Sequence, residues 1–325
     1  GIKGISPTLL LQQKDGSFFS FDSSFWKKES GYEDSAIQAF DLENDGDLDI
    51  YIASGGKSFR PGSMYYQDRI YINQDGHGHF VKAHQHLPFI PQSTSLVQIS
   101  DFDQDGDSDI LLVCQNPKMI QTELSDCYIL TNHNGYFNKN KILNPYNFGK
   151  ITDVLFHDLN QDGLQDLIVV GEWMPISVFI NNNGHYDDFT AEMGLSKSHG
   201  FWQKIEKVDM DNDGDLDFCF RNRGENSFYK ASLNQPALLL LEDFDGDNLV
   251  DPIQFYYYPD GVAYPKGSLD DLSIRIPDIK KHFSSYQEFS KASFNTFIKL
   301  LKKEDFEFYI RLKLTSIILG DDIFD

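Results

Sequence analysis

A nine-residue acidic motif occurs five times in this chain, and its repetition constrains the fold more than any other feature. Every copy has Asp at positions one, five and nine. The copies begin at residues 41, 101, 158, 209 and 243, so successive starts lie 60, 57, 51 and 34 residues apart. A period of this length indicates a repeat protein in which each unit is one small group of secondary-structure elements. The motifs occupy residues 41–49, 101–109, 158–166, 209–217 and 243–251.

The segments around each motif indicate β-strands. A short apolar segment precedes the first motif at residues 36–40, and another follows it at residues 50–53. The same pattern surrounds the other copies. Further along come strand-like pairs joined by Asp75-Gly76, Asn134-Gly135 and Asn183-Gly184, and an Asx-Gly dipeptide is the strongest short-range signal for a β-hairpin. Each unit is therefore predicted to hold four antiparallel strands, as one blade of a β-propeller does.

We accordingly predict an all-β fold, a β-propeller of four-stranded antiparallel blades, as a single domain over residues 1–325. The two ends of the chain do not follow this four-stranded pattern. Residues 9–22 supply a partial blade, and the first residues already resemble a strand, so we expect the sequence to begin inside a longer protein. A small helical insert is expected at residues 269–305 and a strand of a further blade at 306–319. The predicted blades are residues 35–83, 94–139, 150–190, 203–233 and 236–258.

The motif has the composition of a calcium loop. Ca²⁺ is a hard cation that takes about six to eight oxygen ligands. A tight loop supplies oxygens from alternate side chains, and a leucine at position seven is compatible with a ligand from the main-chain carbonyl. Position six is Gly or Asn, which reach left-handed backbone angles most easily. About five Ca²⁺ sites are expected, with ligands at Asp41, Glu43, Asp45, Asp47 and Asp49; Asp101, Asp103, Asp105, Asp107 and Asp109; Asp158, Asn160, Asp162, Leu164 and Asp166; Asp209, Asp211, Asp213, Asp215 and Asp217; and Asp243, Asp245, Asp247, Leu249 and Asp251.

Two other interpretations of the motif compete with this one. An EF-hand loop ends in a bidentate Glu at position twelve and continues as a helix. Position twelve here is Ile52, Leu112, Val169, Phe220 or Gln254, inside a strand-like segment, so the EF-hand is excluded. Solvated turns without metal remain the alternative. The apolar residue at position two of every motif favours a loop anchored to a core.

Charge and hydropathy exclude several classes of partner. The formal net charge is -22 and the pI is near 4.6. So acidic a chain repels phosphate backbones, which makes nucleic-acid binding unfavourable. No run of about 18 apolar residues is present, so no membrane span is expected. Three cysteines, Cys114, Cys127 and Cys219, do not form a disulfide scaffold or a zinc site.

The repeat resembles the FG-GAP or VCBS repeat, which builds the integrin α-subunit propeller and many bacterial secreted proteins. A closer resemblance is to bacterial VCBS-repeat proteins related to the cartilage acidic protein group. This resemblance implies a seven-bladed ring, of which this chain supplies about five blades and fragments. It also implies an exported, cell-surface or periplasmic protein, with the acidic loops on one face. The segments that carry the resemblance are residues 54–56, 66–73, 170–175, 198–202, 243–247 and 286–292.

The opposite face, by the same resemblance, holds long loops that contain aromatic and arginine residues. Such residues are typical of recognition surfaces for protein or sugar. The alternative is that the tryptophan rings pack the loops against one another. The candidate ligand-binding residues are Arg60, Tyr65, Tyr66, Trp173, His199, Trp202, Arg221 and Arg223.

No catalytic residues are predicted. The sequence has no GxSxG elbow, phosphate loop or HExxH motif. The favoured function is a non-catalytic, calcium-binding adhesion-type module for an unknown protein or glycan. One alternative is a calcium-dependent carbohydrate-active enzyme, a glycosidase or polysaccharide lyase, with a catalytic Glu such as Glu172 or Glu192. Another is a purely structural module of a larger secreted protein.

Overall fold

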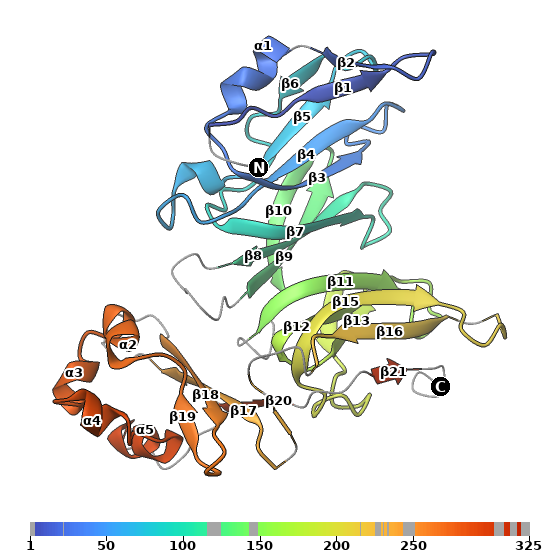
Figure 1. The fold of residues 1–325 in the computed structure, drawn as a ribbon. Helices are drawn as coiled ribbons and strands as arrows, with labels where there is room; N and C mark the ends of the chain where they lie inside the picture. Colours follow the sequence, from blue (N-terminus) through green and yellow to red (C-terminus); the bar gives the residue numbers. More distant parts are fainter. Residues whose placement is uncertain are drawn as a thin grey trace. The chain divides into compact units, whose positions relative to one another are not determined.

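The fold is all-β, with mostly antiparallel sheets and a few short helices (Figure 1). The structure is a computed structural model. The chain divides into a first compact unit, Gly1–Asn147 with Gln161–Gln165 and Asn181–Asp187, and a second, Phe148–Asn160 with Asp166–Ile180 and Asp188–Asp325. The described residues are 4–21, 23–115, 125–142, 149–214, 216–224, 229, 231–232, 234–242, 251–301, 309–312 and 317–319.

The first unit contains a two-stranded hairpin and two four-stranded antiparallel sheets. The hairpin turns at Asp15-Gly16, and the sheets run in the orders β3-β4-β5-β6 and β10-β9-β8-β7. Consecutive strands are therefore neighbours, which is the pattern of a propeller blade. The strands are β1 (Leu9–Gln12), β2 (Phe18–Phe21), β3 (Asp34–Phe40), β4 (Asp49–Ser54), β5 (Arg69–Asn73), β6 (Phe80–Lys82), β7 (Ser93–Ser100), β8 (Asp109–Gln115), β9 (Ser125–His133) and β10 (Tyr136–Ile142).

The next strands form a seven-stranded sheet in the order β14-β13-β12-β15-β16-β21, with β11 also paired to β12. Two groups of strands meet where β12 pairs with β15 through Glu172↔Phe201 and Met174↔Gly200. The ladder skips Trp173, whose φ of +65° marks a local irregularity. The strands are β11 (Lys150–His157), β12 (Asp166–Met174), β13 (Ser177–Asn182), β14 (His185–Asp188), β15 (Gly200–Val208), β16 (Asp217–Asn222) and β21 (Ile317–Leu319).

A last four-stranded sheet has the order β19-β18-β17-β20. It consists of β17 (Ala237–Glu242), β18 (Asp251–Tyr257), β19 (Ala263–Pro265) and β20 (Tyr309–Leu312). The segment expected as a strand of a further blade thus contributes β20 to this sheet and β21 to the preceding one, pairing with β17 and β16. Both strands therefore extend sheets that the earlier repeats begin.

The helical insert lies where the sequence places it, beside β17–β19 (Figure 1). Ser268 begins its first helix with a capping box, because its hydroxyl accepts from Asp271 N while Asp271 accepts from Ser268 N. Phe255 of the sheet packs edge-to-face on Phe297 of the last helix, with ring centroids 5.2 Å apart. The helices are α2 (Leu269–Arg275), α3 (Ile279–His282), α4 (Tyr286–Phe289) and α5 (Phe294–Leu301).

A second helical element, which the sequence pattern did not predict, precedes β3. It comprises α1 (Ser23–Trp26) and the 3₁₀ turn η1 (Lys27–Glu29), and another 3₁₀ turn, η2 (Met64–Tyr66), lies before β5. Trp26 is buried against Ile52 and Tyr71 of the first sheet. Through Trp26 this short segment covers one face of the sheet. Burying a large aromatic side chain contributes about 1.5–3 kcal/mol to stability. No helix in the part of the chain that the structure describes is long and apolar enough to cross a membrane.

Neighbouring sheets of the first unit are joined by hydrogen bonds from a β-bulge. Ser35 is skipped in the β3–β4 ladder, and its hydroxyl donates to Thr94 O of the next sheet at 2.6 Å. In the second unit Thr152 is skipped in the same way, and its hydroxyl donates to Trp202 O at 2.9 Å. A bulge frees one residue from the ladder and redirects its side chain. Each bulge therefore attaches the first strand of one group to the first strand of the next.

A buried carboxylate strengthens the junction in the first unit. Asp68, just before β5, accepts hydrogen bonds from Tyr51 Oη at 2.6 Å, Ser54 N at 2.6 Å and Thr94 Oγ1 at 2.8 Å. Burial raises its pKa to about 6 in spite of these three donors. Since Thr94 belongs to the second sheet and Asp68 to the first, the contact fixes one sheet against the other.

An ion cluster holds the segment before β3 to the first sheet. Arg69 is 3% exposed, and its guanidinium contacts Glu29 at 3.2 Å and also Asp34. It lies 3.8 Å from the centroid of the Tyr32 ring. Glu29 also accepts from Tyr71 Oη at 2.7 Å. The buried cation is thus paired with two carboxylates that come from outside its own strand.

Replacing Arg69 by Met should lower the free energy of unfolding by about 3 kcal/mol, because removing one partner of a buried ion pair leaves the other charges uncompensated. Arg60→Met is the matched control: Arg60 is exposed in the same unit, and a surface change of this kind costs about 0.5 kcal/mol or less. Urea denaturation of both variants measures the difference. Equal losses in the two variants would contradict a stabilising role for the cluster.

Candidate functional site

Four of the five acidic motifs lie where the structure describes the chain, and each forms the loop between the first two strands of its group. The loops join β3 to β4, β7 to β8, β11 to β12 and β15 to β16. Position six has a φ of +94° in Gly46, +98° in Gly106, +91° in Gly163 and +104° in Gly214, a backbone conformation that glycine adopts most easily. Asp215 and residues 243–250, which are all of the fifth predicted loop except its last residue, lie outside the described residues.

The Asp at position nine closes each loop. In the second loop Asp109 Oδ2 accepts from the position-two nitrogen, Phe102 N, at 3.0 Å. The same bond links Asp49 to Leu42 at 2.9 Å. It recurs in the third and fourth loops, at 2.8 and 2.9 Å. The side chains of Asp49, Asp109 and Asp166 are fully buried. Position nine therefore fixes the return of the loop into the second strand.

An asparagine in the third strand completes this arrangement, and sequence reasoning did not identify it as part of the site. Asn132 N donates to the free oxygen of Asp109, Oδ1, at 2.8 Å. Its amide donates to Ser108 O at 3.1 Å, and its Oδ1 accepts from Gly135 N at 2.8 Å in the Asn134-Gly135 turn. Asn73 makes the equivalent three contacts in the first sheet. One buried amide thus ties the acidic loop to the hairpin beyond it.

The carboxylates at positions one, three and five face inward and bond to main-chain nitrogens of their own loop. Asp41 accepts from Asp45 N at 3.1 Å and from Gly46 N at 2.9 Å. Asp101 accepts from Gly106 N at 3.1 Å through Oδ2 alone. These bonds curl the loop around its acidic side chains, so that they converge.

Convergence is closest in the second and fourth loops. Carboxylate oxygens of Asp101, Asp103 and Asp109 lie within 4.8 Å of one another, as do those of Asp209, Asp211 and Asp213. Among the described residues, Oδ1 of Asp101 is shielded from solvent without a hydrogen-bond partner, and so is Oδ1 of Asp47 in the first loop. Buried carboxylate oxygens are ordinarily paired or bound to a metal. The donor set is all oxygen, which suits a hard cation such as Ca²⁺.

The raised pKa values of the loop carboxylates also favour a bound cation. Burial, together with the smaller effect of the neighbouring carboxylates Asp103 and Asp105, raises the pKa of Asp109 to about 6. Burial and neighbouring carboxylates also raise the pKa of Glu43, Asp49 and Asp103. Close like charges disfavour ionisation in this way. Ionised together, these groups repel, and a bound cation would remove the repulsion.

The four loops are not equivalent. At position two, Leu42, Phe102 and Leu159 are buried, as expected of an anchored loop, but Met210 is 52% exposed. In the fourth group the described third strand is the late-joining β21, which pairs with β16 through Phe218↔Leu319. In the third loop Asn160 at position three and Leu164 at position seven stand in place of two carboxylates.

The predicted ligand-binding residues fall into two sets. Arg60, Tyr65 and Tyr66 belong to the first unit. Tyr66 is fully buried and donates to Phe59 O at 2.9 Å, whereas Tyr65 is 40% exposed and stacks on Phe59 with centroids 4.9 Å apart. Arg60 is exposed. Of this set, Tyr65 and Arg60 present side chains to solvent.

In the second unit, Trp173 and Trp202 are 2% and 1% exposed. Trp202 donates from Nε1 to Ser198 O at 2.9 Å, and Trp173 packs edge-to-face on Phe201. These are the contacts expected of rings that pack loops together. His199 is half-buried, and burial lowers its pKa to about 4. Arg221 and Arg223 are the members of this set that lie near solvent, and both are exposed.

Glu172, one of the two glutamates considered for catalysis, is engaged in contacts within the second unit. Its Oε1 accepts from Arg223 Nη2 at 2.8 Å and from Gln203 Nε2 at 3.1 Å. Glu192 is exposed. The two cysteines on adjacent strands, Cys114 and Cys127, are buried free thiols.

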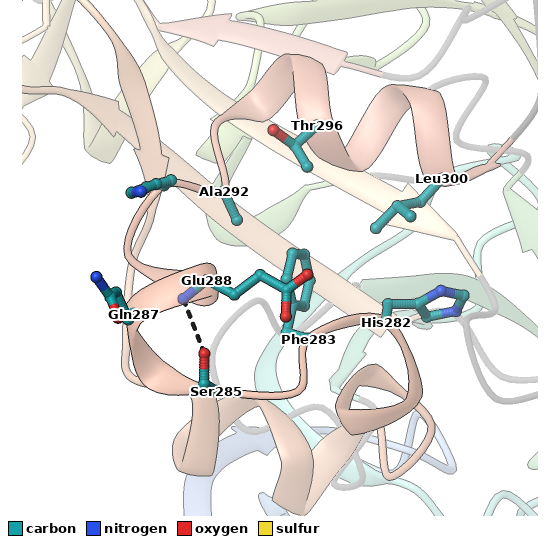
Figure 2. A pocket seen from close by; sticks show the side chains of 9 residues that line it. His282, Phe283, Ser285, Gln287, Glu288, Ala292, Thr296 and Leu300 are labelled. Atoms are coloured by element: carbon teal, nitrogen blue, oxygen red, sulfur yellow. Dashed lines mark hydrogen bonds between the residues drawn. The ribbon is translucent and has the colours of Figure 1, made fainter.

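A hollow of about 520 Å³ lies in the helical insert (Figure 2). Phe283, Ala292 and Leu300 supply its apolar wall, and His282 lies at one side. The carboxylate of Glu288 is held by Ser284, whose N and Oγ donate to Oε2 at 2.8 and 2.9 Å. This hollow contains none of the predicted metal-ligating or ligand-binding residues.

Comparisons with known proteins identify the repeat. The family model of the FG-GAP-like repeat matches residues 41–112 and 158–220, which include the first four acidic loops. No curated protein matches the chain. Among solved structures, the crystal structure of the V. cholerae biofilm matrix protein Bap1 aligns with a TM-score of 0.35 at 15% sequence identity. The alignment covers 80% of this chain and 41% of that protein, so this chain spans less than half of its length.

Asn132→Ala should destabilise the chain by about 2 kcal/mol, because it leaves Ser108 O and Gly135 N without their buried partner. Asn138→Ala on the neighbouring strand β10 is the control, since Asn138 is exposed. Thermal unfolding of both variants in EDTA measures the effect without metal. A loss no larger than that of the control would show that Asn132 is dispensable to the loop.

The metal-free protein should become less stable as the pH rises from about 4 to about 6. The pKa of Asp109 is about 6 in the folded chain against 3.8 for an ordinary Asp carboxyl, so the folded state binds the proton more tightly and its advantage disappears as that proton leaves. Asp109→Asn should lose this part of the pH dependence. Urea denaturation in EDTA at several pH values measures the slope, and an unchanged slope in the variant would contradict the assignment.

Proposed function

We propose that this chain, which carries FG-GAP-like repeats in two stretches, is a calcium-binding repeat protein whose bound ions stabilise the turn between the first two strands of each repeat. The observation that carries the proposal is the convergence of Asp101, Asp103 and Asp109, with the buried Oδ1 of Asp101 lacking any partner among the described residues. Such an oxygen is the donor a metal uses. Calcium supplies positive charge that neutralises the clustered carboxylates.

About five sites are proposed, one for each motif. The second loop offers Asp101, Asp103 and Asp109 at close range, and the fourth offers Asp209, Asp211 and Asp213. The first loop carries the same residue types, with Glu43 at position three. The third has Asn160 and Leu164 in place of two carboxylates and is expected to bind most weakly. In every loop the position-six residue is Gly or Asn, so the same tight turn is available.

The repeats are proposed to be blades of a β-propeller. Supporting this, three sheets have four antiparallel strands, and the acidic loop follows the first strand of each group. The hydroxyls of Ser35 and Thr152 join first strands of successive groups. Contacts between first strands are what a ring of blades around an axis needs. The seven-bladed ring of the family is the proposed parent architecture.

The biological role that we propose is that of an exported or cell-surface, non-catalytic module that binds a protein or glycan. The candidates for such contacts are the exposed side chains of Arg60 and Tyr65 in the first unit and, separately, of Arg221 and Arg223 in the second. Repeat scaffolds of this kind present recognition residues in loops on a rigid frame. Glu172 is occupied by Arg223 and Gln203, an arrangement that serves packing.

Calcium should raise the thermal midpoint of the protein, and EDTA should reverse the change, because a ligand that binds only the folded state stabilises it by about 2.7 kcal/mol per site at a hundredfold excess over its Kd. The double variant Asp101→Asn/Asp103→Asn should lose part of this gain. Isothermal titration calorimetry counts the sites, with one fewer expected in the variant.

Glu192→Gln is the control for these titrations, since it removes one exposed carboxylate outside the loops. It should keep the full calcium response. An identical midpoint in millimolar calcium and in EDTA would refute the proposal.

Protein and glycan panels probed with and without calcium test the binding role. Calcium-dependent capture of a partner is expected. Capture of no partner in either condition would count against that role and favour a structural module.

A further inference from the structure

Neighbouring acidic loops of the first unit are connected directly, by side chains that no metal-ligand pattern assigns a role. Asn44, at position four of the first loop, donates from Nδ2 to Asp107 Oδ1 of the second loop at 3.0 Å. Gln104, at position four of the second loop, donates from Nε2 to Gly163 O of the third. The same position of successive loops therefore reaches the following loop in both cases.

The backbone at position four directs these side chains outward. Asn44 has a φ of +55° and Gln104 a φ of +60°, both in the left-handed region that non-glycine residues seldom adopt. Gln161 and Asn212, at position four of the other described loops, have φ values of +58° and +64°. The loop geometry that curls the carboxylates inward thus places an amide on its outer side each time.

The acceptors lie at positions six and seven of the next loop, inside its tight turn. Asp107 is held at its other oxygen as well, since Oδ2 accepts from Asn134 N at 3.2 Å. Its own nitrogen donates to Asp105 at 2.9 Å. In the third loop position seven is Leu164, and the longer glutamine reaches the carbonyl of Gly163 instead. Both bonds therefore end on the segment that must be ordered for that loop to enclose a cation.

We propose that Asn44 and Gln104 are positioning residues that couple calcium binding between successive loops. The inference rests on the proposed function. Ordering one loop around a cation fixes the backbone at its position four, and the amide then holds positions six and seven of the next loop in place. The next cation finds a loop that has already lost part of its conformational freedom, so it binds more tightly. Because coupling between two sites is reciprocal, a cation in the second loop also favours binding in the first.

Peptide-resolved hydrogen exchange during a calcium titration tests this, because it reports the residues 41–49 and 101–109 separately. Blocking the second loop with Asp101→Asn/Asp103→Asn should raise the calcium midpoint of the first loop roughly 5- to 10-fold, the lower part of the usual range for coupled sites. In the Asn44→Gly background the same block should leave that midpoint unchanged. Glycine keeps the left-handed backbone at position 44 and removes only the amide.

Asn212→Gly is the matched control, since Asn212 has the same position and backbone angle, and its side chain makes no hydrogen bond to another loop within the described residues. In the Asn212→Gly background, blocking the second loop should still raise the calcium midpoint of the first loop. The proposal is overturned if the block shifts the midpoint equally with and without Asn44, or shifts it in neither. If calcium protects no loop in the wild-type chain, the proposed function fails, and the coupling fails with it.

Discussion

The ninth-position aspartate is the interaction on which the remaining architecture depends. One carboxylate, fully buried, accepts from the main chain at the start of its own loop and from the third strand of its sheet, as Asp109 does from Phe102 and Asn132. It thereby specifies where the loop ends, where the second strand begins and how the third strand aligns. A buried charge with two main-chain donors is stable only while both stay in place. The repeat is consequently rigid at the point where the acidic side chains gather.

Hydrogen bonds connect the first repeat to the second both before the acidic loop and within it. Before the loop, the bulged Ser35 bonds to Thr94 of the next sheet; within the loop, Asn44 bonds to Asp107. Asp68 adds a third connection, again through Thr94. These bonds join the first sheet of the first unit to the first strand and to the acidic loop of the second sheet. Repeat proteins draw their stability from such nearest-neighbour contacts, and here the neighbour contacts lie beside the acidic loops.

Local patterns in the sequence were sufficient to predict most of the described strands, the Asx-Gly turns, the four described acidic loops and the helical insert. They were insufficient for features that depend on distant residues. Asn132 lies 23 residues after Asp109, and Asn73 lies 24 after Asp49, a spacing that is recognisable only once the strands are paired. Ser35 stands six residues before its motif, but a serine within a strand carries no signal of a bulge. Trp173 illustrates a different limit, because an aromatic residue in a long loop suits recognition and packing equally until its burial is known.

The acidity of the chain follows from this architecture. Each loop concentrates carboxylates because its backbone must be curled by side-chain acceptors, and the same carboxylates then repel one another, as the raised pKa values of Asp103 and Asp109 indicate. Protonation relieves that repulsion in mild acid, and a divalent cation would relieve it at neutral pH without removing the charge from the acceptors. The cation keeps every main-chain hydrogen bond to an ionised oxygen, which is the stronger bond. The loop requires ionised carboxylates as hydrogen-bond acceptors, and it also requires their mutual repulsion to be neutralised. A bound metal ion meets both requirements, whereas protonation meets only the second.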